Sequence, residues 1–272
     1  MQALQQALWA RNGPDVQAHV GDLAWSLHRE AKQQLWLDGD RCVAWARLTP
    51  PATLDYDVDS PGLHRHVLAW FESEAEGDTL TTYAHESNPE WLEALSTAGY
   101  ERPDPYGWYA YHVRELDGEL PTPAVPEGFT LRTVDGEEDF RKRVKVHRAV
   151  WAPSRVTEDV YRRVTQAWPY RADLDCVLEA PDGTFASYVL CWYDDANKVG
   201  EFEPMGTHPD YRRQGLGAAV CRYGLQRLQA VGARQAIVYA AGGDENAGSR
   251  ALYESVGFRR HARVVELRKQ RA

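Results

Sequence analysis

The sequence predicts an α+β fold, built on a mixed sheet and divided into two tandem domains. A proline-rich stretch interrupts the chain, strand and helix patterns alternate after it, and a weaker series of the same order precedes it. A chain of 272 residues is long enough for two domains with separate cores. We therefore expect domains at residues 1–118 and 129–272, joined by a linker at 119–128.

The linker is the clearest break in the chain. Residues 119–128 contain three prolines and a glycine, a composition that fits neither a helix interior nor a central strand. After it, strand patterns cover 129–134, 175–179, 184–192, 199–207, 235–240 and 264–268, and helical spacing covers 137–151, 157–168, 215–231 and 249–256. Ala180-Pro-Asp-Gly183 marks a hairpin turn between two of these strands.

The first domain shows a similar order in weaker form. Strand patterns cover 35–37, 42–48, 79–84 and 109–113, and helical patterns cover 63–75 and 89–97. The segments that begin at Asn88 and Asn246 also align without gaps, because each has a glycine eleven residues later and an aromatic residue after it. The shared order and this match indicate an internal duplication.

Composition and charge limit the class of protein. With 43% hydrophobic residues the chain can build a core, and no apolar run approaches the roughly 20 residues that span a bilayer. The N-terminus lacks the basic and apolar regions of a secretory signal. Cys42, Cys176, Cys191 and Cys221 form no CxxC pair, so we expect reduced thiols in a cytoplasmic protein.

Charge is distributed unevenly along the chain. Its formal net charge is −9, yet residues 205–272 hold 12 basic and 5 acidic residues. The overall acidity argues against nucleic-acid binding, whereas the basic C-terminal quarter suits either a small polyanion or scattered solvated arginines.

The segment Thr207-His-Pro-Asp-Tyr-Arg212-Arg-Gln-Gly215-Leu-Gly217-Ala218 carries the strongest local signal. It follows an expected strand and opens an expected helix. Glycines let the backbone approach a ligand closely, and free amides at a helix start bind phosphate. The segment is not a P-loop, because no Lys-Ser/Thr follows the glycines, and it is not a complete GxGxxG motif. It predicts either a pyrophosphate cradle or a packed helix entry.

Here the sequence resembles the GCN5-related N-acetyltransferase (GNAT) superfamily. Arg212-Arg-Gln-Gly215-Leu-Gly217 matches its [QR]-x-x-G-x-[GA] acetyl-CoA motif, and the strand before it and the Asn246…Leu252-Tyr253-Glu254…Gly257-Phe258 segment resemble its neighbouring signatures. The match covers about residues 198–260. The two-domain layout resembles that of mycothiol synthase-like members.

The resemblance implies a coenzyme A site in the second domain. Backbone amides from Arg213 to Ala218 would hold the pyrophosphate, and the strand at Met205 and Thr207 would pair with the pantetheine arm. Asn246 would either cap the following helix or bond that arm. The cofactor-binding residues expected on this basis are Met205, Gly206, Thr207, Arg212, Arg213, Gln214, Gly215, Leu216, Gly217, Ala218 and Asn246.

Acyl transfer to an amine also needs two proton movements. The resemblance places Tyr253 where the family often has a tyrosine that protonates the departing thiolate, although a core tyrosine is the alternative. Glu201 and Glu203 face one side of the expected strand and are both candidates for the ammonium proton, Glu201 before Glu203, with solvated strand carboxylates as the alternative. Pro204 lacks an amide hydrogen, so we expect a β-bulge or an edge-strand proline there.

The histidines and aromatic residues give weaker indications of a functional site. No histidine belongs to an HExxH motif or a Cys/His metal set, so packing and surface roles are expected for them. Trp151, Trp168, Tyr170 and Trp192 either line an apolar acceptor pocket or belong to the core.

The first domain departs from the family pattern. Asp55-Tyr-Asp-Val-Asp-Ser-Pro-Gly-Leu63 stands where a cradle is expected and carries three acids, which repel a pyrophosphate. Leu95 stands at the position of Tyr253 and cannot donate a proton. We therefore expect a degenerate copy that binds no coenzyme A.

Two functions compete at this point. The first is an acetyl-CoA-dependent N-acetyltransferase that transfers directly to a primary amine, and the second is a non-catalytic acyl-CoA sensor or assembly module. The acidic remainder of the chain favours a cationic small-molecule or peptide acceptor. We expect no metal, no nucleic acid and no membrane partner, and a monomer or homodimer.

Overall fold

The computed structural model describes residues 1–27 and 29–271, which form two compact units. The first unit comprises Met1–Tyr111, Ala240–Ala247 and Arg260–Ala272, and the second comprises His112–Tyr239 and Gly248–Arg259. Each unit is a group of residues in spatial contact, and both units combine separate stretches of the chain. The ranges 1–118 and 129–272 describe sequence repeats instead, and they stay a prediction. Among the described helices, none combines the length and apolar character that crossing a bilayer requires.

Two short helices begin the first unit, and the sequence analysis predicts neither. The elements in chain order are α1 (Gln2–Asn12), α2 (Val20–Ser26), β1 (Lys32–Asp38), β2 (Arg41–Thr49), β3 (Thr53–Val58), η1 (Pro61–Leu63), α3 (His64–Glu74), β4 (Thr79–His85), α4 (Pro89–Thr97) and β5 (Trp108–Glu115). The hairpin between β1 and β2 turns at Gly39 and Asp40, with Asp38 paired to Arg41.

Strand β3 lies in a segment where the sequence patterns predict no strand. Leu54, Tyr56 and Val58 are buried, so the period of two typical of a strand is present. The intervening acids have partners: Asp55 accepts a bond from Arg47 on the neighbouring strand at 2.8 Å, and Asp57 accepts one from Gln5 at 3.0 Å. The strand is hard to recognise in the sequence because acids alternate with its apolar residues and Gln5 lies far along the chain from Asp57.

The second half of the chain follows the expected order closely. Its elements are β6 (Thr130–Thr133), α5 (Gly136–Val150), α6 (Glu158–Val164), η2 (Ala172–Leu174), β7 (Asp175–Glu179), β8 (Phe185–Asp194), β9 (Val199–Thr207), η3 (Pro209–Tyr211), α7 (Leu216–Ala230), β10 (Gln235–Ala241), η4 (Asp244–Asn246), α8 (Ala247–Ser255) and β11 (Arg259–Gln270). From β7 onward this order repeats that of β1 to β5, which supports the predicted duplication.

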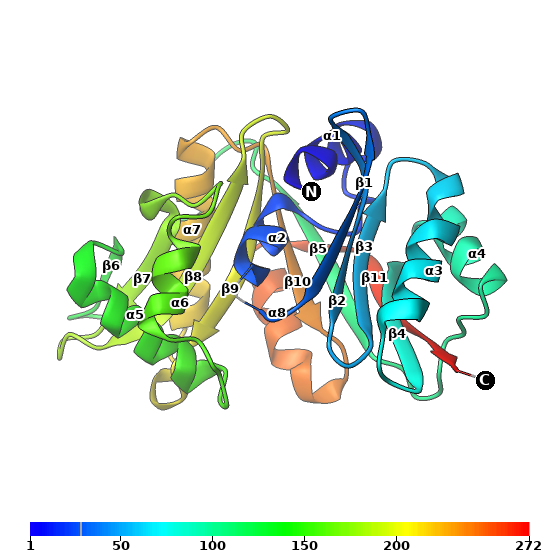
Figure 1. Cartoon of the computed structure of the whole chain (residues 1–272). Coiled ribbons are helices and arrows are strands. Elements are labelled where there is room, and N and C mark those ends of the chain that lie inside the picture. The colour runs from blue at the N-terminus through cyan, green and yellow to red at the C-terminus, as the bar shows by residue number, and fades with distance from the viewer. Residues whose placement is uncertain (28, 272) are drawn as a thin grey trace. The chain divides into compact units, whose positions relative to one another are not determined.

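Each unit is completed by a strand from the other sequence repeat. In the first unit β11 pairs antiparallel with β4, from Val264 opposite His85 to Gln270 opposite Thr79 (Figure 1). The part of β5 from His112 onward belongs to the second unit, where β10 is its neighbour. The final strands of the two repeats have therefore changed places.

Strands β8 and β9 form the centre of the second unit, with a helix against each face. Every residue of β8 is buried. On one face α7 packs so closely that a side chain at Gly224 would lie 2.9 Å from Cys191 Sγ and 3.0 Å from Val189. On the other face α5 covers the sheet, and a side chain at Gly206 would collide with Val150. Buried strands with two covered faces read as near-continuous apolar runs.

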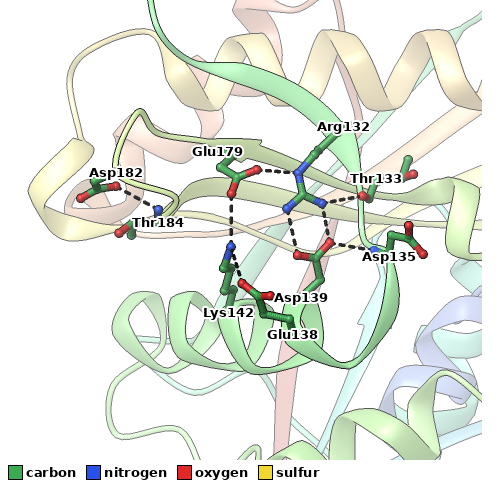
Figure 2. Close-up of polar contacts among 9 residues, drawn as sticks. All are labelled: Arg132, Thr133, Asp135, Glu138, Asp139, Lys142, Glu179, Asp182 and Thr184. Carbon is green, nitrogen blue, oxygen red and sulfur yellow. Dashed lines mark hydrogen bonds and ion pairs between the residues drawn. The ribbon is translucent and has the colours of Figure 1, made fainter.

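An ion-pair network fixes the start of α5 to the outer strands of this unit (Figure 2). Arg132 on β6 donates to Glu179 on β7 at 2.6 Å and to Asp139 on α5 at 2.8 Å. Lys142, one turn further along α5, lies 3.3 Å from Glu179 and 3.2 Å from Glu138. These contacts set the position of α5 over the sheet.

Candidate active site

A β-bulge interrupts strand β9 at Glu203 and Pro204. The antiparallel register with β8 pairs Cys191 with Phe202 and then Val189 with Met205, so two residues of β9 stand opposite one of β8. The indole of Trp192 donates to the Glu203 carbonyl at 2.5 Å, which satisfies the group that the bulge frees. The bulge expected from Pro204 is confirmed.

The bulge reverses the alternation of side chains along β9. Before it, Gly200 and Phe202 face α7, because a side chain at Gly200 would collide with Leu228 and the Phe202 ring lies against Gly224. After it, Gly206 faces α5. Glu201 and Glu203 therefore share the α5 face, as the strand spacing predicts.

The two carboxylates differ in exposure. Glu201 is fully buried, and its register partners are Trp192 on β8 and Ile237 on β10. Glu203 is half-buried. Of the two, Glu203 is thus the carboxylate that a ligand can reach.

Beyond Glu201, β9 separates from β10. The parallel register runs from Val199 opposite Gln235 to Glu201 opposite Ile237, whereas β9 itself continues to Thr207. Within the described chain, the pairing on this side of β9 ends there. The backbone of Met205 and Thr207 consequently lies beyond the region where β10 can serve as a neighbour.

The glycine-rich segment forms a left-handed turn into α7. Arg213 and Gly215 have φ angles of 62° and 78°, and α7 begins at Leu216. Among the described residues, the backbone amides from Arg213 to Ala218 donate no hydrogen bond to the chain. Successive amides in such a turn converge on a concave surface that suits an anion.

Gly217 brings the first turn of α7 against the end of β9. A side chain there would lie 3.2 Å from Thr207 Oγ1, 3.3 Å from Met205 Cε and 3.2 Å from Leu252 Cδ2. Arg212 folds back and donates to the Thr207 carbonyl at 3.2 Å, whereas the exposed residues Arg213 and Gln214 continue the turn. The free amides therefore follow directly after the separated part of β9.

Tyr253 on α8 is buried in the same unit, with 7% of its surface exposed. Burial raises the pKa of its phenol well above 10, and the nearby groups Cys221, Glu203 and Tyr188 raise it further. His112 and Phe258 contact its ring, at centroid distances of 6.1 and 5.9 Å. The phenol thus keeps its proton at neutral pH and lies within electrostatic range of Glu203.

Asn246 makes local contacts in the loop before α8. Its side-chain amide donates to the Gly242 carbonyl at 2.6 Å and to Glu245 at 3.1 Å. It is counted with the first unit, whereas the residues from Met205 to Ala218 belong to the second.

A polar network that the sequence patterns do not predict lies between α5 and the sheet. Arg143 is almost completely buried and donates to the buried Asp175 at 3.0 Å, and the Tyr161 hydroxyl bonds the same carboxylate. The Arg143 guanidinium also lies 3.6 Å from the ring centre of Tyr188. Arg143 could have indicated this network, because it is a charged residue among the α5 positions that are buried against the sheet.

The four aromatic residues proposed for an acceptor pocket divide into two groups. Trp192 is fully buried, with Tyr170 at a ring distance of 6.3 Å, so its role in the core is clear. Trp151 and Trp168 expose 52% and 48% of their surfaces. Large exposed indoles of this kind suit ligand contact.

The corresponding gap in the first unit is filled by the chain itself. Strands β3 and β4 pair in parallel only at Thr53–Leu54 among the described residues, which resembles the separation of β9 from β10. Gln17 spans this gap, donating to the Tyr83 carbonyl at 2.9 Å and accepting from the His85 amide at 3.2 Å. What remains is a cavity of about 310 Å³ whose lining includes Asp15, Asp57, Asp59 and Glu90.

Comparison with known proteins agrees with this geometry. Residues 143–258 match the model of the acetyltransferase (GNAT) family. The chain is 29% identical to a mycothiol acetyltransferase of Geodermatophilus obscurus over 77% of its length and 70% of the relative's. A mycothiol acetyltransferase of Streptomyces coelicolor is also 29% identical, over 84% of this chain and 76% of that one.

The fold of the chain also resembles that of a solved structure. A tandem GNAT protein from the clavulanic acid biosynthesis pathway superposes with a TM-score of 0.71 over 99% of this chain and 94% of that one, at 19% identity. The chain has the fold of a tandem GNAT protein. Its mixed sheet and its paired repeats are those of this fold, and its relatives show that it is an N-acetyltransferase.

Proposed function

We propose that this GNAT protein moves an acetyl group from acetyl-CoA to a primary amine by direct attack within a ternary complex. The observation that carries the proposal is the run of free backbone amides from Arg213 to Ala218 at the start of α7. Phosphate oxygens satisfy such amides, and the helix dipole favours their negative charge. Arg212, Arg213 and the exposed Gln214 surround the same turn.

The pantetheine arm would follow the end of β9. Met205, Gly206 and Thr207 lie beyond the last register pair with β10, so their backbone can pair with an added extended chain. Gly217 keeps this edge and the amide turn adjacent. The donor's thioester would then lie near the β-bulge.

The proton steps fall to three side chains. The acceptor arrives as an ammonium ion and must lose a proton before its nitrogen can attack. Glu203, with Glu201 behind it on the same face, would take that proton. Tyr253, whose burial keeps the phenol protonated, would return one to the departing thiolate.

The cysteines favour direct transfer over an acyl-enzyme. Cys191 and Cys221 are fully buried, and burial raises the pKa of both thiols far above neutral. A thiol held in its protonated form is a poor nucleophile. Cys42 belongs to the first unit, whereas the residues from Met205 to Ala218 that are assigned to the donor belong to the second.

The acceptor would be a small cationic amine. Glu201 and Glu203 put negative charge on the α5 face, and the exposed indoles of Trp151 and Trp168 can contact a cation or an apolar surface. The relatives are named for mycothiol, so mycothiol-related amines are the first acceptors to test.

We expect acetyl-CoA to release free thiol when the protein is given a suitable acceptor from a panel of mycothiol-related amines, polyamines, aminoglycosides and peptides. Thiol release measures turnover, and calorimetry measures acetyl-CoA binding. If the protein shows no turnover with any of these amines and does not bind acetyl-CoA, the proposal is wrong.

Two variants distinguish an enzyme from a sensor of acyl-CoA. Tyr253→Phe and Glu203→Gln should each lower kcat by about 100-fold while acetyl-CoA affinity stays within about twofold, because neither residue belongs to the amide turn. Binding without turnover by the wild-type protein on every amine would favour the sensor.

A further inference from the structure

The hydroxyl of Tyr188, on the same face of the sheet as Glu203, is hydrogen-bonded to the buried side chain of His147. Tyr188 on β8 is fully buried and faces α5, because its register partner Gly206 does. Its hydroxyl lies 2.9 Å from His147 Nδ1 and accepts a bond from Trp151 Nε1 at 2.8 Å. Both partners come from the end of α5, which the bonds hold over the sheet.

Hydrogen-bond roles in this cluster follow from the chemistry of its members. An indole nitrogen can only donate, so Trp151 occupies one lone pair of the Tyr188 oxygen. The hydroxyl hydrogen of Tyr188 is then available to His147 Nδ1, which accepts it in the neutral tautomer that carries its hydrogen on Nε2. The oxygen retains a second lone pair for another donor.

Glu203 stands opposite Leu190 in the bulge, and Tyr188 is the next residue of β8 on the same face of the sheet. In addition to burial, the Glu203 carboxylate raises the pKa of the Tyr188 phenol and, like Tyr188, that of Tyr253 on α8. Arg143 and His147 face the Tyr188 ring from α5, and the Arg143 guanidinium stacks on it at 3.6 Å. A cation over the ring favours transient negative charge on the phenol oxygen, which eases proton transfer through it.

We propose that Tyr188 and His147 form a proton path that carries the acceptor's proton away from Glu203. This inference rests on the proposed function. The ammonium N–H bond breaks as Glu203 becomes a carboxylic acid. Glu203 then gives that proton to the Tyr188 oxygen, directly or through one water, while Tyr188 passes its own hydrogen to His147 Nδ1.

The transfers balance in atoms and charge. The acceptor ends as a neutral amine and His147 as an imidazolium, while Glu203 and Tyr188 return to their starting forms. His147 later loses its proton to water. Tyr188 and His147 are positioning residues, because each acts on the acceptor through Glu203.

The closing experiment compares pH profiles of kcat/KM on the best amine of the panel. His147→Asn keeps a hydrogen-bond acceptor near the position of Nδ1, but its amide cannot be protonated. The slope of log(kcat/KM) against pH on the acid side should therefore fall by about one, which corresponds to one proton fewer. Tyr188→Phe should lower kcat by about 10- to 100-fold and leave the KM for acetyl-CoA unchanged. Tyr193→Phe, a buried tyrosine on the opposite face of β8, is the matched control and should change neither.

A measurement without acceptor separates this proposal from the proposed function. ¹⁵N-histidine NMR identifies the imidazole of His147 as the signal that His147→Asn removes. Glu203→Gln should lower the pKa of that imidazole, because it removes a nearby negative charge that favours the imidazolium. An unchanged titration, or an unchanged acid limb in His147→Asn, would overturn the proton path, whereas absence of turnover in the wild type would overturn only the proposed function.

Discussion

At the scale of single residues, burial decides what each ionisable group can do. Asp57 is 3% exposed, and burial raises the pKa of its carboxyl to about 7, against the opposing bonds from Gln5 and the backbone amides of Val58 and Gln17. His64 and His85 are buried in the same unit, and burial lowers the pKa of each to about 4. Their charges are therefore suppressed in the folded chain but present in the unfolded one.

These shifts predict a pH dependence of stability with opposing parts. Between about pH 4 and 7 the unfolded chain ionises Asp57 while the folded chain keeps it protonated, so this group lowers stability as pH rises. The two histidines are protonated in the unfolded chain below about pH 6.5 but not in the folded one, so they raise stability with pH over the same window. As the pH rises through this window, the free energy of unfolding of Asp57→Asn should increase relative to that of the wild type by about 1.4 kcal/mol per pH unit.

Urea unfolding of both proteins at pH 4.5, 5.5 and 6.5 would measure this gain. Asp59→Asn is the matched control, because bonds from Arg41 and Arg11 lower the pKa of Asp59 and keep it ionised in both states over most of that range. If the free energies of unfolding of Asp57→Asn and the wild type change in parallel with pH, the raised pKa of Asp57 is wrong.

At the scale of elements, two local features build the candidate donor site. The bulge at Glu203–Pro204 reverses the facing of β9, and the left-handed turn at Arg213 and Gly215 exposes the first amides of α7. The sequence predicts a β-bulge or an edge-strand proline at Pro204, and glycine freedom at the start of α7. It predicts neither the positive φ of Arg213 nor how closely α7 meets β9, where a side chain at Gly217 would lie against Met205 and Thr207.

Gly217→Val should therefore weaken acetyl-CoA binding by about tenfold or more, since the added carbons push the first turn of α7 away from β9. Gly248→Val is the matched control, because Gly248 also opens a helix but a side chain there meets open space. Calorimetry measures the affinity, and thermal unfolding checks that both variants fold. Equal affinities for the two variants would show that this contact does not position the amides.

At the scale of the whole molecule, duplication has produced two unequal copies. The repeats share their order of elements and have exchanged final strands, yet Gln17 fills the gap in the first unit, and Leu95, fully buried, stands at the position of Tyr253. The first copy retains the fold without the groups assigned to the donor.

We accordingly expect one acetyl-CoA per chain. The carboxylates of Asp15 and Asp59, whose pKa values are lowered by hydrogen bonds, border the first unit's cavity and would repel a diphosphate, whereas the second unit offers free amides. Calorimetric stoichiometry on the intact chain tests this expectation. Arg213→Glu, which places a negative charge on the amide turn, should abolish binding, and one site remaining in that variant would assign binding to the first unit.

The sequence by itself determined the order of strands and helices from β6 onward, the bulge and the amide turn. These depend on local preferences, such as hydrophobic spacing, proline and glycine, which act over a few residues. Helix α4 and strand β9 have the expected bounds.

Only the tertiary structure decided the rest: the exchange of β5 and β11, the filling of the first gap by Gln17, and the contact of Tyr188 with His147. Each joins residues that are far apart in the sequence, such as Gln17 with Tyr83 and His147 with Tyr188. Local patterns cannot specify such partners, because the free energy of these contacts appears only when the whole chain has folded.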